Sequence, residues 1–154
     1  LVESVNKLQG LAPTLTIGSE APEITLPSPD GKMISLSSTR GNIVLLDFWA
    51  AWCTPCRQEN PNLVKTYEMY KDKGFQIFQV SLDRTREAWL KGIQEDNLGK
   101  WIHVSDLKYW DSVVVPLYGI ESIPHNLLLD REGKIIAIDL RGELLHEKLV
   151  EVFE

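Results

Sequence analysis

Two cysteines, Cys53 and Cys56, are the only thiols in this chain of 154 residues, and two residues separate them. An apolar run over residues 43–52, interrupted by one aspartate, precedes the pair, and a pattern of helical period follows it. The sequence therefore predicts a dithiol where a buried strand meets the first turn of a helix. Unpaired backbone N–H groups and the helix dipole stabilise a thiolate there and can lower a thiol pKa from about 8.5 to about 7 or below. Such a pair can form and break a disulfide reversibly.

Two simpler roles of the cysteine pair compete with redox chemistry. As a purely structural disulfide it would close a loop of about four residues, which stabilises a protein by only ~2 kcal/mol in the chain-entropy model. A structural zinc site usually takes four Cys or His ligands, but His103, His125 and His146 lack the spacing of a second ligand pair. Redox exchange is the favoured interpretation, and a metal-binding module without enzymatic activity is kept as an alternative.

The residues around the cysteines resemble a known family. Residues 47–50 (Asp-Phe-Trp-Ala) and 52–57 (Trp-Cys-Thr-Pro-Cys-Arg) are similar to the active-site segment of the thioredoxin superfamily. The continuation over residues 57–61 (Arg-Gln-Glu-Asn-Pro) resembles more closely the TlpA/ResA-type thiol-disulfide oxidoreductases of bacterial envelopes. The resemblance extends from about Gly18 to Glu154. It implies that the first cysteine attacks a substrate disulfide, that the second resolves the mixed disulfide, and that no metal or organic cofactor is needed.

Two carboxylates, Asp47 and Glu59, are candidates for moving protons near the dithiol. Burial of Asp47 beneath the cysteines would raise its pKa, so that it could accept and return the proton of Cys56. Resemblance supports this role, since thioredoxin-like proteins carry an aspartate here, although the TlpA/ResA type often has another residue. Glu59 follows Cys56 by about one turn, where an acid in the TlpA/ResA type affects the acid–base behaviour of the thiols. The simpler interpretations are an exposed strand-end Asp47 and a solvated Glu59.

A second segment, around Pro124, is expected to face the dithiol. The superfamily places an X-Pro with a cis peptide bond here, and the backbone N–H and C=O of Ile123 could then pair with an extended substrate strand. His125 follows where the family usually has Thr. An imidazole near the thiols could stabilise a thiolate or shuttle a proton, and the simpler interpretation is a surface or core histidine. The predicted substrate-binding residues are Trp52, Thr54, Pro55, Ile123, Pro124 and His125.

Hydrophobic periodicity and the resemblance together predict one α/β domain. An arm or linker over residues 1–18 precedes a thioredoxin-like domain over residues 19–154. We expect a mixed central sheet with helices on both faces, preceded by a β-hairpin with an Asp30-Gly31 turn, and a βα insertion before the cis-proline. The expected elements are strands over 21–27, 33–36, 42–49, 75–82, 101–105, 127–129 and 134–140 and helices over 53–73, 86–95, 111–118 and 142–153.

Charge and composition limit the partners. A net charge of −6 and a pI of about 5.1 argue against nucleic acid and anionic membrane surfaces. The expected partners are protein disulfide substrates and an upstream thiol that donates electrons, and we expect a monomer. No apolar run reaches 18 residues, so no transmembrane helix is predicted, but an anchor or further domain could precede Leu1. Resemblance implies a periplasmic or cell-envelope location, while the two cysteines suit a cytoplasmic protein equally well.

A different enzyme class with the same fold is the thiol peroxidase of the peroxiredoxin relatives. Its peroxidatic cysteine lies in a P-x-x-x-T/S-x-x-C pattern, but Leu46 and Ala50 occupy the Pro and Thr/Ser positions before Cys53. The favoured function is therefore thiol-disulfide exchange, with peroxidase activity as an alternative. The resemblance implies that the exchange reduces disulfides in exported proteins. The direction of electron flow stays open, because Thr54 and Pro55 between the cysteines tune the redox potential without revealing its value.

Overall fold

A five-stranded mixed sheet organises the chain in the computed structural model, which describes residues 15–154. From one edge to the other its strands are β5 (Ile102–Val104), β4 (Phe75–Ser81), β3 (Ile43–Trp49), β6 (His125–Leu129) and β7 (Ile135–Ile138). Strands β3, β4 and β5 run parallel, whereas β6 runs antiparallel to both of its neighbours. The predicted arm over residues 1–18 lies outside the described residues except for its last four positions.

A β-hairpin precedes the sheet. Its strands, β1 (Thr25–Pro27) and β2 (Met33–Ser35), form a separate two-stranded sheet. Gly31 in the turn has a φ of 87°, a conformation that glycine adopts without the steric cost of a Cβ. The predicted hairpin is confirmed, although its strands are shorter than the alternating patterns. The ladder ends at Ser35 because the chain turns into a 3-10 helix at Leu36 directly after β2.

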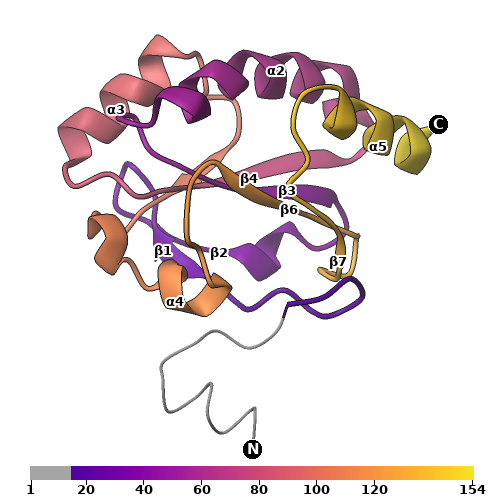
Figure 1. Ribbon diagram of the computed structural model, residues 1–154, viewed down its shortest axis with the longest axis horizontal. Coiled ribbons are helices and arrows are strands. Elements are labelled where there is room, and N and C mark those ends of the chain that lie inside the picture. Colours follow the sequence, from indigo (N-terminus) through magenta and orange to yellow (C-terminus); the bar gives the residue numbers. More distant parts are fainter. Residues whose placement is uncertain (1–14) are drawn as a thin grey trace, which may run out of the picture.

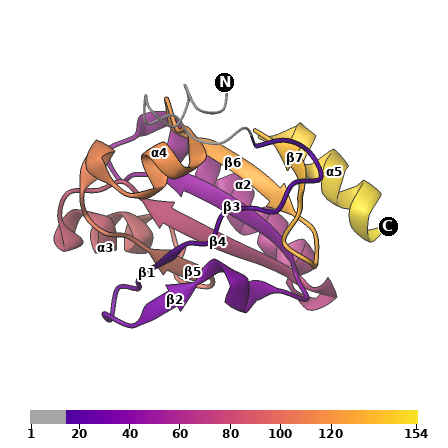
Figure 2. The same ribbon diagram turned by 90° about the horizontal axis from the view of Figure 1, so that it is seen from below.

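Helices lie on both faces of the sheet, as predicted (Figures 1 and 2). One face carries α2 (Thr54–Tyr70), α3 (Arg86–Glu95) and α5 (Glu143–Phe153), and the other carries α4 (Val114–Tyr118) and the hairpin. Helix α3 and strand β5 form the predicted insertion between the dithiol and Pro124. The architecture is a thioredoxin-like α/β fold. No helix within residues 15–154 is long and apolar enough to cross a membrane.

The largest differences from the predicted elements lie at their ends. The helix predicted over residues 53–73 ends as an α-helix at Tyr70 and continues as a 3-10 turn over Lys71–Lys73. Gly74 then stops it with a φ of 95°, as expected for a glycine after a helix. The strand predicted over residues 134–140 ends with β7, because Asp139 adopts a φ of 56°, which no extended strand accommodates.

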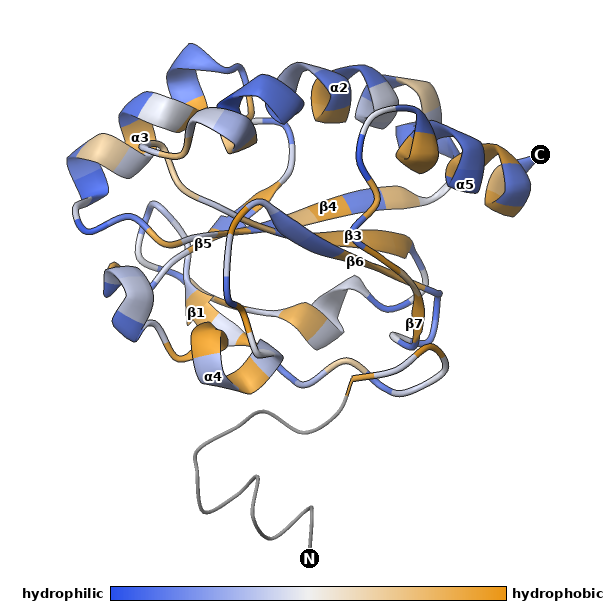
Figure 3. Cartoon of the chain, in the orientation of Figure 1, coloured by the Kyte–Doolittle hydropathy of each residue, from blue (hydrophilic) through white to orange (hydrophobic). Residues whose placement is uncertain are grey.

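The core packs on both faces of β3, whose seven positions are all buried. Figure 3 shows mainly hydrophobic residues along the strands of the sheet and hydrophilic residues on the outer sides of the helices. On α5, Leu145 and Leu149 are fully buried, whereas Leu144 is 60% exposed. The apolar stripe of this helix therefore faces the sheet.

Two neighbouring leucines of α5 provide a matched test of this packing. Leu145→Ala should lower the free energy of unfolding by about 2–5 kcal/mol, because it removes buried methyl groups and leaves a cavity. Leu144→Ala should change the free energy by less than about 0.5 kcal/mol. Urea unfolding of both oxidised variants, followed by far-UV circular dichroism, measures the difference. Equal destabilisation by the two substitutions would contradict the packing described here.

Candidate active site

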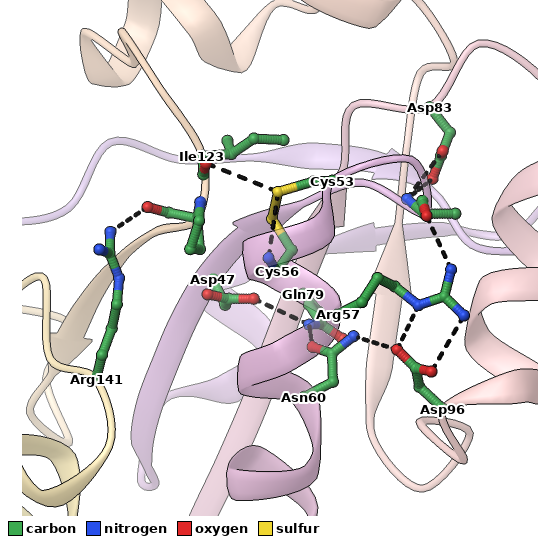
Figure 4. The surroundings of a disulfide bond; sticks show 12 residues. Asp47, Cys53, Cys56, Arg57, Asn60, Gln79, Asp83, Asp96, Ile123 and Arg141 are labelled. Carbon is green, nitrogen blue, oxygen red and sulfur yellow. Dashed lines mark hydrogen bonds and ion pairs between the residues drawn. A yellow bond between two sulfur atoms is a disulfide. The ribbon is translucent and has the colours of Figure 1, made fainter.

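The disulfide Cys53–Cys56 lies where β3 leads into α2 (Figure 4). Cys53 is the N-cap of α2, with extended backbone angles (φ −90°, ψ 104°), and its Sγ accepts the backbone N–H of Cys56 at 3.3 Å. Pro55 occupies the first turn, where a missing N–H costs no hydrogen bond. Both cysteines are buried. The predicted dithiol at a strand–helix junction is confirmed.

Two side chains hold the peptide groups of Ala51 just before the disulfide. The carboxylate of Asp83 accepts the Ala51 N–H at 3.0 and 3.2 Å, and Arg57 Nη1 donates to the Ala51 carbonyl at 2.8 Å. Burial raises the pKa of Asp83, and hydrogen bonds from Ser81 and Ala51 oppose that rise. Helix α3 packs close to the loop, because a Cβ added to Gly92 would lie 2.7 Å from the Ala51 Cβ. These contacts fix the loop from three directions.

The segment around Pro124 faces the disulfide, as predicted. The Ile123–Pro124 peptide bond is cis, and the Ile123 carbonyl oxygen lies 3.7 Å from Cys53 Sγ (Figure 4). Arg141, from the loop between β7 and α5, donates a hydrogen bond to the Pro124 carbonyl. Ile123 is half-buried, so its side chain and backbone border the sulfur.

Asp47 is buried under the active-site helix rather than exposed at a strand end, since only 4% of it is accessible. Gln79 Nε2 donates to Asp47 Oδ2 at 2.9 Å and to Asn60 Oδ1 at 3.3 Å. Asn60 follows Cys56 by four residues and therefore shares its face of α2. Burial raises the pKa of Asp47 to about 7. The Gln79 hydrogen bond lowers it, the charge of Glu59 raises it, and the charge of Arg141 lowers it.

Glu59 lies half-buried on the same helix. Its Oε2 accepts the Asn62 side-chain amide at 2.9 Å and the Gly142 backbone N–H at 3.0 Å. Glu59 therefore ties α2 to the start of α5 and contributes negative potential at Asp47. Its effect on the thiols stays a prediction.

His125 is engaged on the side of β7. Its Nδ1 lies 2.8 Å from Asp139 Oδ1, and its ring stacks on Phe48 with 6.0 Å between ring centroids. The side chain is thus neither free on the surface nor fully enclosed. An influence of His125 on the thiols stays a prediction.

Trp52 presents an aromatic surface beside Cys53. Its side chain is 47% exposed, and its ring centroid lies 5.4 Å from that of Tyr109 and 6.4 Å from that of Trp110. Arg84 lies over the Tyr109 ring at 4.1 Å. Trp49, by contrast, is fully buried in the core. The sequence did not predict that Tyr109 and Trp110 lie beside the cysteines, because no pattern in the chain connects these residues with the cysteine pair.

A buried polar network beneath α2 was also missed from the sequence. Asn60 Nδ2 donates to Asp96 Oδ2 at 2.8 Å, and Arg57 Nε donates to the same oxygen at 2.6 Å. The network therefore runs from Asp47 through Gln79, Asn60 and Asp96 to Arg57, as Figure 4 shows. The available signal was Gln79, a polar residue inside the apolar run of β4. Among residues 15–154, no three His, Cys, Asp or Glu side chains come together as a metal site.

A cysteine pair that caps a helix after the central strand of a mixed sheet, opposite a cis-proline, is the site of a thioredoxin-like protein that exchanges thiols and disulfides. Known proteins agree. The model of the AhpC/TSA family matches residues 17–138. The thiol-disulfide oxidoreductase ResA of Bacillus thuringiensis subsp. konkukian is 32% identical over an alignment of 142 residues, and the alignment covers 89% of this chain and 76% of that protein.

Two solved structures add support. The thioredoxin domain of a thiol-disulfide oxidoreductase from Bacteroides vulgatus is 43% identical, with a TM-score of 0.84 over 92% of this chain and 100% of that one. A thiol:disulfide interchange protein from Bacteroides sp. is 42% identical, with a TM-score of 0.80 over 90% of this chain and 91% of that one. The chain belongs to the AhpC/TSA family and, within it, is a ResA-like thiol-disulfide oxidoreductase. Nothing in these comparisons supports a thiol peroxidase or a metal-binding module.

The raised pKa of Asp47 predicts that the free energy of unfolding decreases as pH rises toward neutrality. The folded carboxyl keeps its proton up to about pH 7, whereas an unfolded Asp loses it near ~3.9. Between about pH 4 and pH 7 the folded state therefore binds more protons than the unfolded state, and the free energy of unfolding falls as pH rises through this interval. Asp47→Asn removes this titration. The stability of the variant relative to wild type should thus rise by on the order of 4 kcal/mol between pH 4 and pH 8.

Urea unfolding of the oxidised wild type and of Asp47→Asn, repeated across this pH range, measures the effect. Asp72→Asn is the matched control, because it makes the same substitution at an exposed aspartate and should leave the pH dependence of stability as it is in the wild type. Parallel stability curves for wild type and Asp47→Asn would show that the buried carboxyl titrates normally.

Proposed function

We propose that this oxidoreductase reduces disulfide bonds in exported proteins, with Cys53 as the nucleophile and Cys56 as the resolving thiol. The position of Cys53 Sγ is the main observation that supports Cys53 as the nucleophile. This sulfur accepts an N–H of the first turn of α2 and borders the Ile123 carbonyl at 3.7 Å. A thiolate at that position is stabilised by the helix terminus and lies beside a backbone edge that an extended substrate can use.

The reaction then proceeds in two exchanges. The Cys53 thiolate attacks one sulfur of the substrate disulfide, a mixed disulfide forms, and the other substrate sulfur leaves as a thiolate. Cys56 loses its proton and attacks Cys53 Sγ, the Cys53–Cys56 disulfide forms, and the second substrate sulfur leaves. Two electrons pass from the protein dithiol to the substrate. An upstream thiol must reduce the Cys53–Cys56 disulfide for the next cycle, and no metal or organic cofactor takes part.

Asp47 is proposed as the group that accepts the Cys56 proton. A general base works best when its pKa lies near the operating pH, and burial raises the pKa of Asp47 to about 7. Glu59 contributes indirectly, because its charge raises the pKa of Asp47. Protonated Asp47 can later return the proton to a departing thiolate.

The substrate is proposed to lie across the surface around Cys53. Trp52, Thr54 and Pro55 are exposed there, and Trp52 offers an apolar face that continues into Tyr109 and Trp110. Ile123, Pro124 and His125 form the opposite border, with Ile123 as the backbone partner of an extended chain. Envelope location is inferred from the resemblance to oxidoreductases of bacterial envelopes.

Cysteine variants test the two thiol roles. Cys56→Ser should accumulate a mixed disulfide between Cys53 and a peptide disulfide, because the resolving step is removed. Cys53→Ser should form no adduct and lose reductase activity. Mass spectrometry of the adducts and insulin reduction measure both outcomes. A stable adduct on Cys56 in the Cys53→Ser variant would reverse the assignment.

An equilibrium redox titration tests the direction. A reductant should show one two-electron transition near the potential of thioredoxin, about −270 mV, read by tryptophan fluorescence and checked by thiol alkylation. A midpoint near ~−120 mV, typical of strong oxidants, would make the protein a disulfide donor and overturn the proposed direction.

A further inference from the structure

One row of the central sheet is polar across four strands. Asp47 on β3 is in register with Asn126 on β6 and with Gln79 on β4, and Gln79 is in register with His103 on β5. All four residues are buried. Figure 3 shows short hydrophilic stretches that interrupt the hydrophobic strands. Since a buried polar group without a partner is costly, the partners of each member reveal what the row is arranged to do.

The two outer members of the row, Asn126 and His103, form hydrogen bonds to other parts of the chain and not to Asp47. Asn126 donates its side-chain N–H to the Leu140 carbonyl at 2.8 Å and accepts the Leu140 N–H at 2.9 Å. His103 Nε2 bonds to the Leu98 carbonyl at 2.6 Å, and burial lowers the pKa of His103 to about 4, so its ring is neutral. Gln79 is the row neighbour that bonds to Asp47.

The orientation of the Gln79 amide is fixed by Trp101. Trp101 Nε1 donates to Gln79 Oε1 at 3.0 Å, and an indole N–H can only donate. The Gln79 oxygen must therefore face Trp101, which leaves the NH₂ group to face Asp47 and Asn60. A glutamine that could turn over would offer Asp47 either a donor or an acceptor, and Trp101 removes that choice.

We propose that Gln79, held by Trp101, is a positioning residue that presents a permanent N–H donor to Asp47 and so keeps this carboxylate able to take the proton of Cys56. A donor favours the charged form of a buried carboxylate, whereas an acceptor would favour the protonated form. The inference rests on the proposed function of Asp47 as proton acceptor. It adds two residues, Gln79 and Trp101, that touch neither the sulfurs nor the substrate surface.

Other charged groups around Asp47 do not replace this donor. Glu59 on α2 adds like charge, and Arg141 from the β7–α5 loop adds opposite charge. Arg141 directs its Nη2 to the Pro124 carbonyl, and His125 on β6 directs its Nδ1 to Asp139. Cys56 on α2 is the group that exchanges its proton with Asp47. Gln79 therefore supplies the direct hydrogen bond to the carboxylate, and the remaining groups act through space.

Carboxyl-carbon NMR titration of Asp47 tests the inference in the intact protein, in both redox states. Gln79→Met keeps the side-chain shape and removes the donor, so the Asp47 pKa should rise by roughly 1 to 2, as expected for loss of a hydrogen bond to a charged group. Trp101→Phe removes the hydrogen bond that fixes the Gln79 amide, and it should raise the Asp47 pKa by less than Gln79→Met does. This second variant keeps the test decisive if Gln79→Met does not fold.

Matched controls separate these effects from general loss of packing. Gln76→Met changes the same residue type on the same strand, three positions away and therefore on the opposite face. Trp89→Phe removes an indole N–H that is buried without a partner among the described residues. Neither control should move the Asp47 pKa. An unchanged Asp47 pKa in both Gln79→Met and Trp101→Phe, or equal changes in the controls, overturns the inference.

Reductase pH profiles connect the pKa to activity. In the wild type, activity should rise with pH as Asp47 loses its proton, and this rise is the acidic limb of the profile. In Gln79→Met the acidic limb should move to higher pH together with the Asp47 pKa. A limb that moves by one pH unit should lower the activity at pH 7 by up to about tenfold, and the activity should recover at higher pH. Asp47→Asn should abolish the limb.

The pH profiles of Asp47→Asn and Gln79→Met also separate this inference from the proposed function on which it rests. A limb that survives in Asp47→Asn overturns the proposed role of Asp47. A limb that vanishes in Asp47→Asn yet stays in place in Gln79→Met overturns the inference alone.

Discussion

The sulfur of Cys53 stands where a side-chain oxygen usually caps a helix, and it accepts the backbone N–H of Cys56. That single contact requires the chain to turn from β3 into α2 at this residue, with the loop before it held by Asp83 and Arg57. It also places the proposed nucleophile at the positive end of a 17-residue helix, which favours the thiolate. Fold, loop contacts and reactivity all depend on this helix start.

The same helix start accounts for the buried polar network beneath it. In the proposed mechanism Cys56 loses its proton inside the protein and Asp47 is the base that accepts it. Burial shields Asp47 from water and raises its pKa. The cost is a loss of folded-state stability as pH rises from about 4 to about 7, the interval between the unfolded and folded pKa values of this carboxyl. Gln79 and Trp101 limit that cost by satisfying the carboxylate with a fixed donor. In the proposed mechanism the same hydrogen bonds therefore affect both stability and proton transfer.

Much of the fold and the reacting pair followed from local features of the chain. Apolar runs of strand length, helical stripes such as that of α5, and the turn at Gly31 are short-range signals with direct physical causes. The predicted ends of helices and strands were less accurate. The turn at Asp139 and the 3-10 turn after Tyr70 depend on contacts made by the folded chain. The position of Asp47 under the dithiol was anticipated because its strand runs directly into the cysteines.

By itself the sequence determined the chemistry, since C-x-x-C at a strand–helix junction has few other uses, and the type of fold that displays it. Only the tertiary structure decided which distant side chains serve that chemistry. Gln79, Trp101 and Tyr109 lie between 20 and 60 residues beyond the cysteines. The local sequence marks Gln79 only as a polar residue within an apolar run, and it connects none of the three with the site. They meet the site because sheet register and the inserted α3–β5 unit bring them there, and register is a property of paired strands, which no single segment carries.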